Sequence, residues 1–434
     1  MKVKPYSIPI GKLKKEVSGR ENRIYPDDIL HYCSPSVGGW GVVRVACLVP
    51  EAVVLFVIPQ GCGRHGAIAS YMHKYNRKLF YIYLSEVDLV TGCHMEKINK
   101  AVERIIYKHR PKALLLCHTC VDDLLGSDYE AKAYEIEEKY GIPVRIGTMN
   151  PIKKESKKPP ELMIQNTIYG FLKNNMKKEN TINVIGSFAN IDSECEIHEL
   201  MRGCGYKKLL HIRDMESLDS YMQMAKSKYA FLIKPSGSLA VKHMKKSLNI
   251  DYVDVPVSYR KEDIRRNYEL IGNMLGVKMD VDKYERQSED VIRESIRNIG
   301  KISVAIGTTA NACPFELARE LVERDIHVPY VFADQLMVSD YEHVDWLSEN
   351  ASYMKVYTTL SPSMISFIKE ENKVDIAIGF DAGYFCSESK TVPLSVDEQP
   401  YGYKGVEKLY SRILETINKP QNFKREMYQS GLVI

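Results

Sequence analysis

Three cysteines of this 434-residue chain, Cys33, Cys62 and Cys120, each lie where a predicted strand gives way to a turn marked by Gly or Pro. Loops at the ends of parallel strands meet at one edge of an α/β sheet. Cysteine thiolates gathered in this way are the usual ligands of iron–sulfur clusters. We therefore interpret the three cysteines as ligands of one metal site. Their local sequences are Tyr32-Cys33-Ser34-Pro35, Gly61-Cys62-Gly63 and Thr119-Cys120-Val121.

The other cysteines are mostly expected to be structural. The chain has 10 Cys, and a free cysteine commonly behaves as a small buried hydrophobe. Glycines beside the Cys33 and Cys62 loops set these two apart, because Gly lets the backbone approach a bulky inorganic ligand. The spacing matches neither a zinc ribbon nor a clustered ferredoxin motif. We expect core positions for Cys47, Cys195, Cys204, Cys313 and Cys386.

A fourth ligand is not evident from the sequence. A [4Fe–4S] cluster needs four ligands, so three cysteines leave one position open unless a subunit interface supplies it. Cys117 and Cys93 are possible additional ligands. Within a strand, Cys117 and Cys120 would point to opposite faces, so both can ligate only if the chain turns between them. The acids that follow, Asp122 and Asp123, are expected to be solvated.

Composition indicates an ordinary globular protein of two to three domains. With 60 basic and 56 acidic residues the net charge is +4, which does not indicate a nucleic-acid surface. The start of the chain has no apolar run typical of a signal peptide. The longest apolar stretch, Leu48 to Ile58, contains Glu51 and is too short to span a bilayer. We expect a cytoplasmic protein with reduced thiols and no membrane partner.

Short apolar runs alternate with helical stretches in three successive sets, a pattern typical of parallel sheets covered on both faces. The sequence therefore predicts an α/β protein with three Rossmann-like, doubly wound domains. The expected divisions are an N-terminal arm (1–30), a metal-bearing domain (31–160), a second domain (161–280), and a third domain with a C-terminal helix and tail (281–434). Predicted strands are 53–59, 79–84, 113–117 and 143–147; 182–186, 208–212, 229–233 and 252–257; and 302–307, 328–333, 354–357 and 376–380.

Two of the predicted strands end in glycine, at Gly186 and Gly307. Such a turn can simply lead into the next helix, or its free backbone N–H groups can bind an anion. We expect the plain turn at Gly186, whereas Thr308 and Thr309 leave an anion site open at Gly307. Neither turn carries a full Gly-x-Gly-x-x-Gly or Walker sequence, so nucleotide binding is not supported.

The ordered set of motifs resembles the component-one family of nitrogenase-like oxidoreductases, and the resemblance covers most of the chain. That family places three cysteines in the same order in its first domain. The stretch from Glu86 to Gly92 resembles the family's Glu-x-Asp-x-Val-x-Gly-Gly sequence, with Cys93 in place of the second glycine. The resemblance implies an iron–sulfur cofactor on Cys33, Cys62 and Cys120, either [4Fe–4S] or a larger cluster of the P-cluster type.

Two departures from nitrogenase itself concern its molybdenum-iron cofactor. In nitrogenase, one cysteine of the second domain and one histidine near the C-terminus hold that cofactor. Here the matching segments are Lys234-Pro235-Ser236-Gly237-Ser238 and Gln399-Pro400-Tyr401-Gly402-Tyr403, without a cysteine or a histidine. We therefore expect no molybdenum-iron cofactor and no reduction of dinitrogen.

The resemblance implies the iron–sulfur subunit of a two-component reductase. Such a subunit takes low-potential electrons from a separate, homodimeric, ATP-dependent iron protein and reduces another substrate. It would pair with itself or with a sister chain of the same fold. Two alternatives stay open: a scaffold for maturation of the nitrogenase cofactor, and a non-redox α/β binding protein. Catalytic residues and substrate are not identified by the sequence.

Overall fold

The computed structural model describes residues 4–18, 22–27, 29–32, 41–63, 77–150, 158–174, 177–310, 313–369, 373–394 and 400–429. By its internal contacts the chain forms two compact units. One unit comprises residues 38–190 and 205–254, and the other comprises residues 1–37, 191–204 and 255–434. Among the described residues, no helix is both long enough and apolar enough to cross a membrane.

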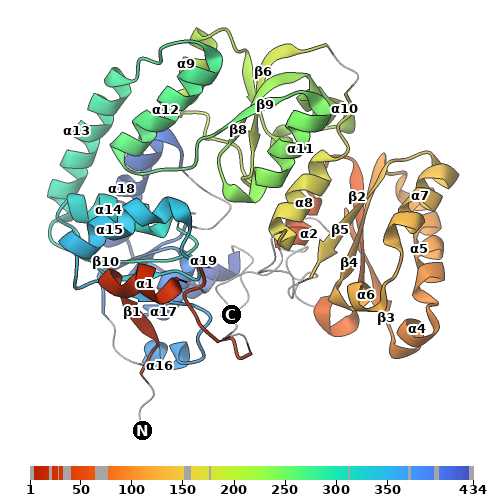
Figure 1. Ribbon diagram of the computed structural model, residues 1–434, viewed down its shortest axis with the longest axis horizontal. Helices are drawn as coiled ribbons and strands as arrows, with labels where there is room; N and C mark the ends of the chain where they lie inside the picture. Colours follow the sequence, from red (N-terminus) through yellow and green to blue (C-terminus); the bar gives the residue numbers. More distant parts are fainter. Residues whose placement is uncertain are drawn as a thin grey trace. The chain divides into compact units, whose positions relative to one another are not determined.

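The first sheet is parallel and has the strand order β3-β2-β4-β5. Its central strand β2 (Ala52–Pro59) is apolar almost throughout, as expected of a strand covered on both faces. One face packs against α5 (His94–His109) and α7 (Tyr129–Tyr140), and the other against α2 (Gly41–Ala46) and α8 (Pro160–Tyr169) (Figure 1). The remaining elements are β3 (Leu79–Leu84), β4 (Ala113–Thr119), β5 (Val144–Met149), α4 (Glu86–Thr91) and α6 (Cys120–Leu125).

The second sheet belongs to the same unit and repeats the same plan, with the order β7-β6-β8-β9 and parallel pairing throughout. Helix α11 (Ser238–Leu248) packs against α8, so one apolar cluster runs from the first sheet into the second. The strands are β6 (Glu179–Ile185), β7 (Lys208–Leu210), β8 (Ser227–Leu232) and β9 (Asp251–Asp254). The short helices are η3 (Ile212–Asp214), α10 (Leu218–Met222), η4 (Gln223–Lys226) and η5 (Pro235–Gly237).

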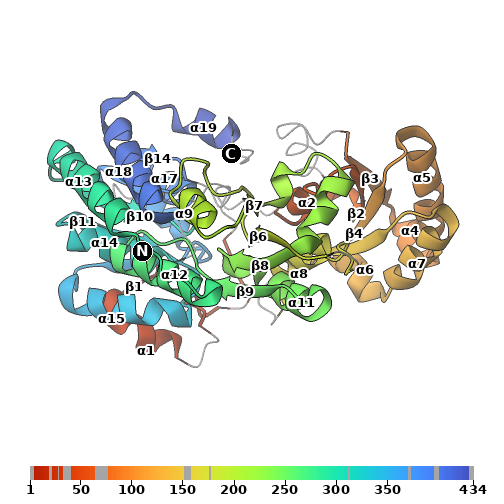
Figure 2. The same ribbon diagram turned by 90° about the horizontal axis from the view of Figure 1, so that it is seen from above.

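The third sheet forms the core of the other unit, with the order β1-β12-β11-β10-β13-β14. Strand β1 (Ser7–Pro9) pairs antiparallel with β12 (Lys355–Tyr357) and covers that edge. Helices α13 (Asp282–Ile299) and α18 (Gly402–Asn418) pack side by side (Figure 2). The other strands are β10 (Ser303–Ile306), β11 (His327–Phe332), β13 (Ile376–Ile378) and β14 (Lys390–Val392).

The remaining helices of this unit follow the chain from one end to the other. They are η1 (Ile10–Lys12), α1 (Leu13–Val17), α9 (Ile197–Gly203), α12 (Lys261–Leu275), α14 (Pro314–Glu323), η6 (Val338–Asp340), α15 (Tyr341–Asn350), α16 (Met364–Lys369), α17 (Phe380–Phe385) and α19 (Phe423–Gln429).

The predicted fold class is confirmed, because the chain builds three mainly parallel sheets within an α/β fold. All 12 predicted strands are present, with ends shifted by a few residues. The sequence reading missed two short edge strands, β1 and β14. Each has only three residues, and such a segment is too short to show a hydrophobic period of its own.

Candidate functional site

Two of the three predicted ligands lie at one edge of the first sheet. Strand β2 ends at Pro59 and residues 60–63 turn into a helix, so Cys62 is exposed just beyond the strand. Strand β4 ends at Thr119, and Cys120 is the half-buried first residue of α6. Because β2 and β4 are adjacent and parallel, with Phe56 paired to Cys117, both cysteines follow the carboxyl ends of neighbouring strands. This is also where the strand order reverses, the usual ligand position in such sheets.

The other proposed ligands have different positions. Cys33 lies outside the described residues. Cys93 is exposed and precedes α5, directly after Gly92, which adopts a left-handed conformation with φ of 70°. It follows β3, the neighbour of β2 on its other side. Cys93 therefore belongs to the same sheet edge as Cys62 and Cys120.

Cys117 points into the apolar core. It is fully buried within the cluster that packs α2 and α8 on the sheet, and burial raises the pKa of its thiol. A Cβ atom added to Gly147 would lie 2.8 Å from the Cys117 Sγ, so β5 closes over this thiol. The chain does turn between Cys117 and Cys120, at the junction of β4 and α6, but the Cys117 thiol is packed among apolar side chains.

The expectation that Asp122 is solvated is wrong. Its side chain is 1% exposed, and its Oδ1 accepts a 2.8 Å hydrogen bond from the Tyr129 hydroxyl. His94 Nε2 lies 3.5 Å from the same oxygen and 3.1 Å from the Ser127 Oγ. The Asp122 Oδ2 is enclosed without a hydrogen-bond partner in the described part of the chain. A buried polar group thus fixes α6, the helix that presents Cys120, onto α5 and α7.

The anion site left open at Gly307 is already filled by the protein. Asp381, fully buried on α17, accepts hydrogen bonds from the backbone N–H groups of Thr308 (2.5 Å) and Thr309 (3.3 Å). The hydroxyl groups of both threonines donate to the same carboxylate, at 2.7 Å each. Burial raises the pKa of Asp381, and these four hydrogen bonds oppose that effect. The turn therefore binds an internal carboxylate, and its N–H groups are not available to a ligand.

A second carboxylate closes the start of α18, the turn compared with the histidine-bearing turn of nitrogenase. Glu196, 6% exposed, accepts hydrogen bonds from the backbone N–H groups of Tyr403 (2.7 Å) and Lys404 (3.1 Å) and from the Tyr268 hydroxyl (2.6 Å). Gly402 has a φ of 66°, and a side chain there would run into this carboxylate. Glu196 thus serves as an N-terminal cap from a distant part of the chain.

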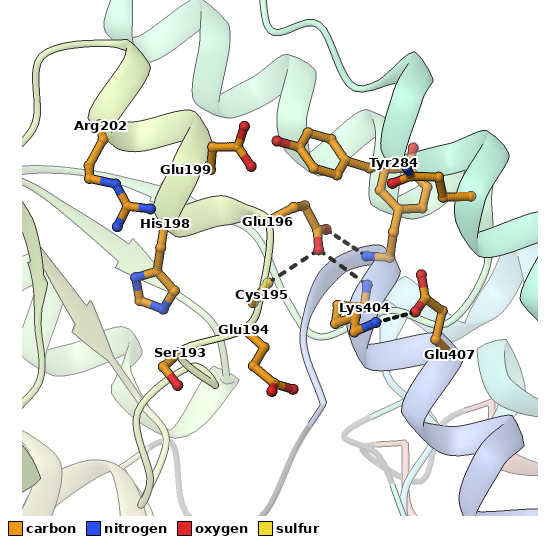
Figure 3. Close-up of a pocket in the computed structure, with 12 residues that line it drawn as sticks. Ser193, Glu194, Cys195, Glu196, His198, Glu199, Arg202, Tyr284, Lys404 and Glu407 are labelled. Carbon is orange, nitrogen blue, oxygen red and sulfur yellow. Dashed lines mark hydrogen bonds and ion pairs between the residues drawn. The ribbon is translucent and has the colours of Figure 1, made fainter.

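A polar pocket of about 260 Å³ opens beside Glu196, between α9, α13 and the first turn of α18 (Figure 3). Its charged groups are largely paired. Lys404 Nζ lies 2.6 Å from Glu407, and Lys283 Nζ lies 3.6 Å from Glu199. The pocket is hydrophilic and has no buried nucleophile arranged beside a general base. The remaining described lining residues include Ser193, Glu194, Cys195, His198, Arg202, Tyr284 and Gln287.

The buried carboxylates were not found from the sequence. Asp381 follows a predicted strand and Gly379, a position that could have suggested a role in a turn. Glu196 carried no such signal, because its partners are about 70 and 200 residues away in the sequence. The five cysteines assigned to the core are all withdrawn from solvent at least in part, with Cys204 and Cys313 half-buried.

Comparison with known proteins gives consistent matches. The family model for nitrogenase component 1 type oxidoreductases matches residues 38–418. The nitrogenase iron-molybdenum cofactor biosynthesis protein NifE of Clostridium pasteurianum is 26% identical over 255 residues, 57% of this chain and 54% of that protein. The chain thus spans about half the length of that relative. NifE of Rhizobium meliloti (strain 1021) is 22% identical over 380 residues, 81% of this chain and 77% of that protein.

A solved structure described as nitrogenase Cp1 at pH 6.5 has the same fold. It superposes with a TM-score of 0.69 at 17% sequence identity, covering 87% of this chain and 91% of its own. At this identity the match concerns the fold alone. It confirms the arrangement of sheets expected from the sequence.

Proposed function

We propose a function for this chain from one premise: it belongs to the nitrogenase component 1 type oxidoreductase family. Within that family, we propose that it is the iron–sulfur subunit of a two-component reductase. It would receive low-potential electrons from a separate ATP-dependent iron protein and pass them to a substrate other than dinitrogen. The chain is expected to work as a dimer with itself or with a sister chain of the same fold.

The observation that carries this proposal is the position of Cys62 and Cys120. Both thiols follow the carboxyl ends of adjacent parallel strands, and neither is packed in the apolar core. Thiolates are the ligands that iron–sulfur clusters require, so the donor chemistry of this edge fits such a cluster. Cys62, Cys120 and Cys33 would hold it, and Cys93 is the additional cysteine at the same edge. When bound, the cluster would supply one-electron transfer at low potential.

The rest of the chain then has a supporting role. Asp122, Tyr129 and His94 fix the helix that presents Cys120, so the thiol is held in place before any metal arrives. The substrate is expected to differ from dinitrogen because the segments at Pro235 and Tyr401 offer neither thiolate nor imidazole. At the Tyr401 turn, the Glu196 carboxylate already uses the backbone N–H groups.

A second candidate function is an assembly scaffold. The matches to two NifE proteins, named for biosynthesis of the iron-molybdenum cofactor, support it. A scaffold would bind a metal cluster at the same cysteines but release it to another protein. The cysteine edge supports both functions, so they differ in what happens to the bound metal.

Anaerobic purification tests the metal site. The parent chain should contain iron and acid-labile sulfide, and Cys62→Ala, Cys120→Ala and Cys33→Ala should each lose most of the iron. Cys204→Ala is the matched control, because this half-buried thiol contacts Met279 in the other unit and should leave iron content unchanged. Equal iron in the parent and all three variants would contradict the site.

A second measurement separates the two functions. Loaded protein is mixed with an ATP-dependent iron protein, MgATP and dithionite, with or without a metal-free acceptor protein of the same family. A reductase subunit should retain its iron while its cluster is repeatedly reduced and reoxidised. Loss of iron to the acceptor, without sustained oxidation of the iron protein, would favour the scaffold. Absence of iron from the parent would exclude both.

A further inference from the structure

The carboxyl edge of the second sheet carries two arginines on one aromatic ring. Phe188 follows β6 and the Gly186 turn, at the point where this sheet's strand order reverses. The guanidinium carbon of Arg44, on α2, lies 4.5 Å from the Phe188 ring centroid, and that of Arg213, after β7, lies 5.2 Å from it. Ligands in open α/β sheets bind at such an edge.

The arrangement concentrates positive charge. Both guanidiniums lie near one ring, so they are within about one Debye length of each other, about 10 Å at 0.1 M salt, and repel with little screening. Arg213 is exposed, and no carboxylate of the described residues forms an ion pair with it. The adjacent Asp214 accepts a hydrogen bond from the Asn190 amide. A ligand with negative charge would relieve this repulsion.

A buried histidine fixes the loop that carries Arg213. His211 is fully buried, and its Nδ1 accepts a 3.1 Å hydrogen bond from the Arg213 backbone N–H. Its Nε2 therefore carries the proton and donates to the Ser187 carbonyl at 3.1 Å. Burial lowers the pKa of His211, which keeps the ring neutral. The hydrogen bonds tie the loop after β7 to the turn after β6, so Arg213 is held beside Phe188.

Side chains, and not backbone amides, provide the donors at this edge. The backbone N–H of Gly237, at the turn after β8, already donates to the Lys234 carbonyl at 3.1 Å. Gly186 approaches the same turn so closely that an added Cβ would lie 3.1 Å from the Lys234 nitrogen. Phosphate sites typically use free N–H groups of such turns. Planar guanidiniums instead suit carboxylates, which they bind through paired hydrogen bonds.

We propose that Arg44 and Arg213, positioned by Phe188, form a recognition site for an organic dicarboxylate. Two arginines from different elements match two carboxylate groups better than one. The site goes beyond the proposed electron-transfer function, because recognition of an anion by these side chains needs no metal. It can therefore be tested on protein with or without iron.

Calorimetric titration of the full chain with glutarate tests the proposal, with inorganic phosphate and the dimethyl ester of glutarate as comparison probes. Glutarate should bind saturably, the uncharged ester should not bind, and phosphate should bind more weakly. Arg213→Gln and Arg44→Gln should each weaken glutarate binding about 10- to 100-fold, the loss expected for charge-assisted hydrogen bonds. Arg202→Gln, an exposed arginine of the other unit, is the control and should bind like the parent.

Several results would overturn the proposal. They are failure of the parent to bind glutarate, phosphate binding more tightly than glutarate, and equal affinities in the parent and Arg213→Gln. Equal weakening in the Arg202→Gln control would also overturn it, because the effect would then be one of net charge. Arg213 is exposed and its substitution should preserve folding, so this variant decides the matter even if Arg44→Gln does not fold.

Discussion

Single carboxylates occupy positions in this chain that a bound anion could otherwise take. Asp381 fills the Gly307 turn and Glu196 fills the start of α18. Each accepts hydrogen bonds from two backbone N–H groups that have no partner within their own helix or turn. Buried N–H groups rarely remain unpaired, so a side chain must satisfy them where no ligand does. These residues therefore define where the chain does not bind anions.

Glu196→Ala should destabilise the unit that contains α18. The substitution leaves two backbone N–H groups and the Tyr268 hydroxyl without their acceptor, which should lower the free energy of unfolding by about 2–4 kcal/mol. Glu196→Gln keeps an acceptor oxygen and should lose less. Urea denaturation followed by circular dichroism measures both.

Glu199→Gln supplies the comparison for Glu196. Glu199 is exposed on the same helix, so its substitution should change the free energy of unfolding by no more than about 0.5 kcal/mol. A Glu196→Ala variant as stable as Glu199→Gln would show that Glu196 is not an effective cap.

At the scale of elements, α14 carries two buried carboxyl groups one turn apart. Burial raises the pKa of Glu316 to about 8 and that of Glu320 to about 7, from an ordinary value of 4.5. Glu316 accepts hydrogen bonds from the backbone N–H groups of Tyr259 and Arg260, at 2.7 and 2.6 Å. The helix therefore holds protons in the folded state that the unfolded chain has already lost near neutral pH.

Stability should consequently fall as pH rises. Below about pH 4.5 both carboxyls are protonated in both states, and their contribution is fully present. Between that value and about pH 7 to 8 the unfolded chain ionises first, so the contribution is lost, at up to about 1.4 kcal/mol per pH unit for each group. Denaturant unfolding between pH 5 and 8.5 should show a shallower dependence for Glu316→Gln and Glu320→Gln than for the parent. Identical slopes would contradict the buried, protonated state.

The Gly307 turn depends on the absence of a side chain. A Cβ at Gly307 would lie 2.6 Å from the Asp381 Cγ, so Gly307→Ala should displace the buried carboxylate and lower stability by about 1–3 kcal/mol. Thermal unfolding measures the loss. Gly203→Ala is the control: this glycine is in α9 with nothing near its Cβ position, and alanine there should slightly raise stability. Equal effects of the two substitutions would show that the Gly307 turn can open freely.

At the scale of the whole molecule, the cysteine edge of the first sheet also carries exposed apolar side chains. Val90 on α4 is 87% exposed and Leu124 on α6 is 79% exposed. Both helices follow strand ends at this edge, beside the positions of Cys93 and Cys120 (Figure 1). Exposed apolar groups that gather beside a candidate ligand set are typical of an interface. They support the proposed dimer, in which a partner could supply the fourth cluster ligand.

The loaded protein should accordingly behave as a dimer, with itself or with a sister chain. Val90→Asp and Leu124→Asp should shift it toward monomer in sedimentation and reduce its iron content. Tyr107→Asp is the control, because Tyr107 is 86% exposed near the far end of α5, away from this edge, and should leave assembly unchanged. A monomer with a complete cluster would contradict the shared interface and direct attention to Cys93.

The sequence alone determined the three α/β sheets, since apolar strands and helical stretches alternate in a period that local chemistry dictates. It also determined that Cys62 and Cys120 follow strand ends, because turn residues mark those ends. Only the tertiary structure decided which strands are neighbours, and hence that these two cysteines share an edge while Cys117 is packed in the core. It likewise placed Asp122, Glu196 and Asp381 in buried sites and brought Arg44 and Arg213 to one ring. These contacts join residues far apart in the chain, and no local pattern encodes them.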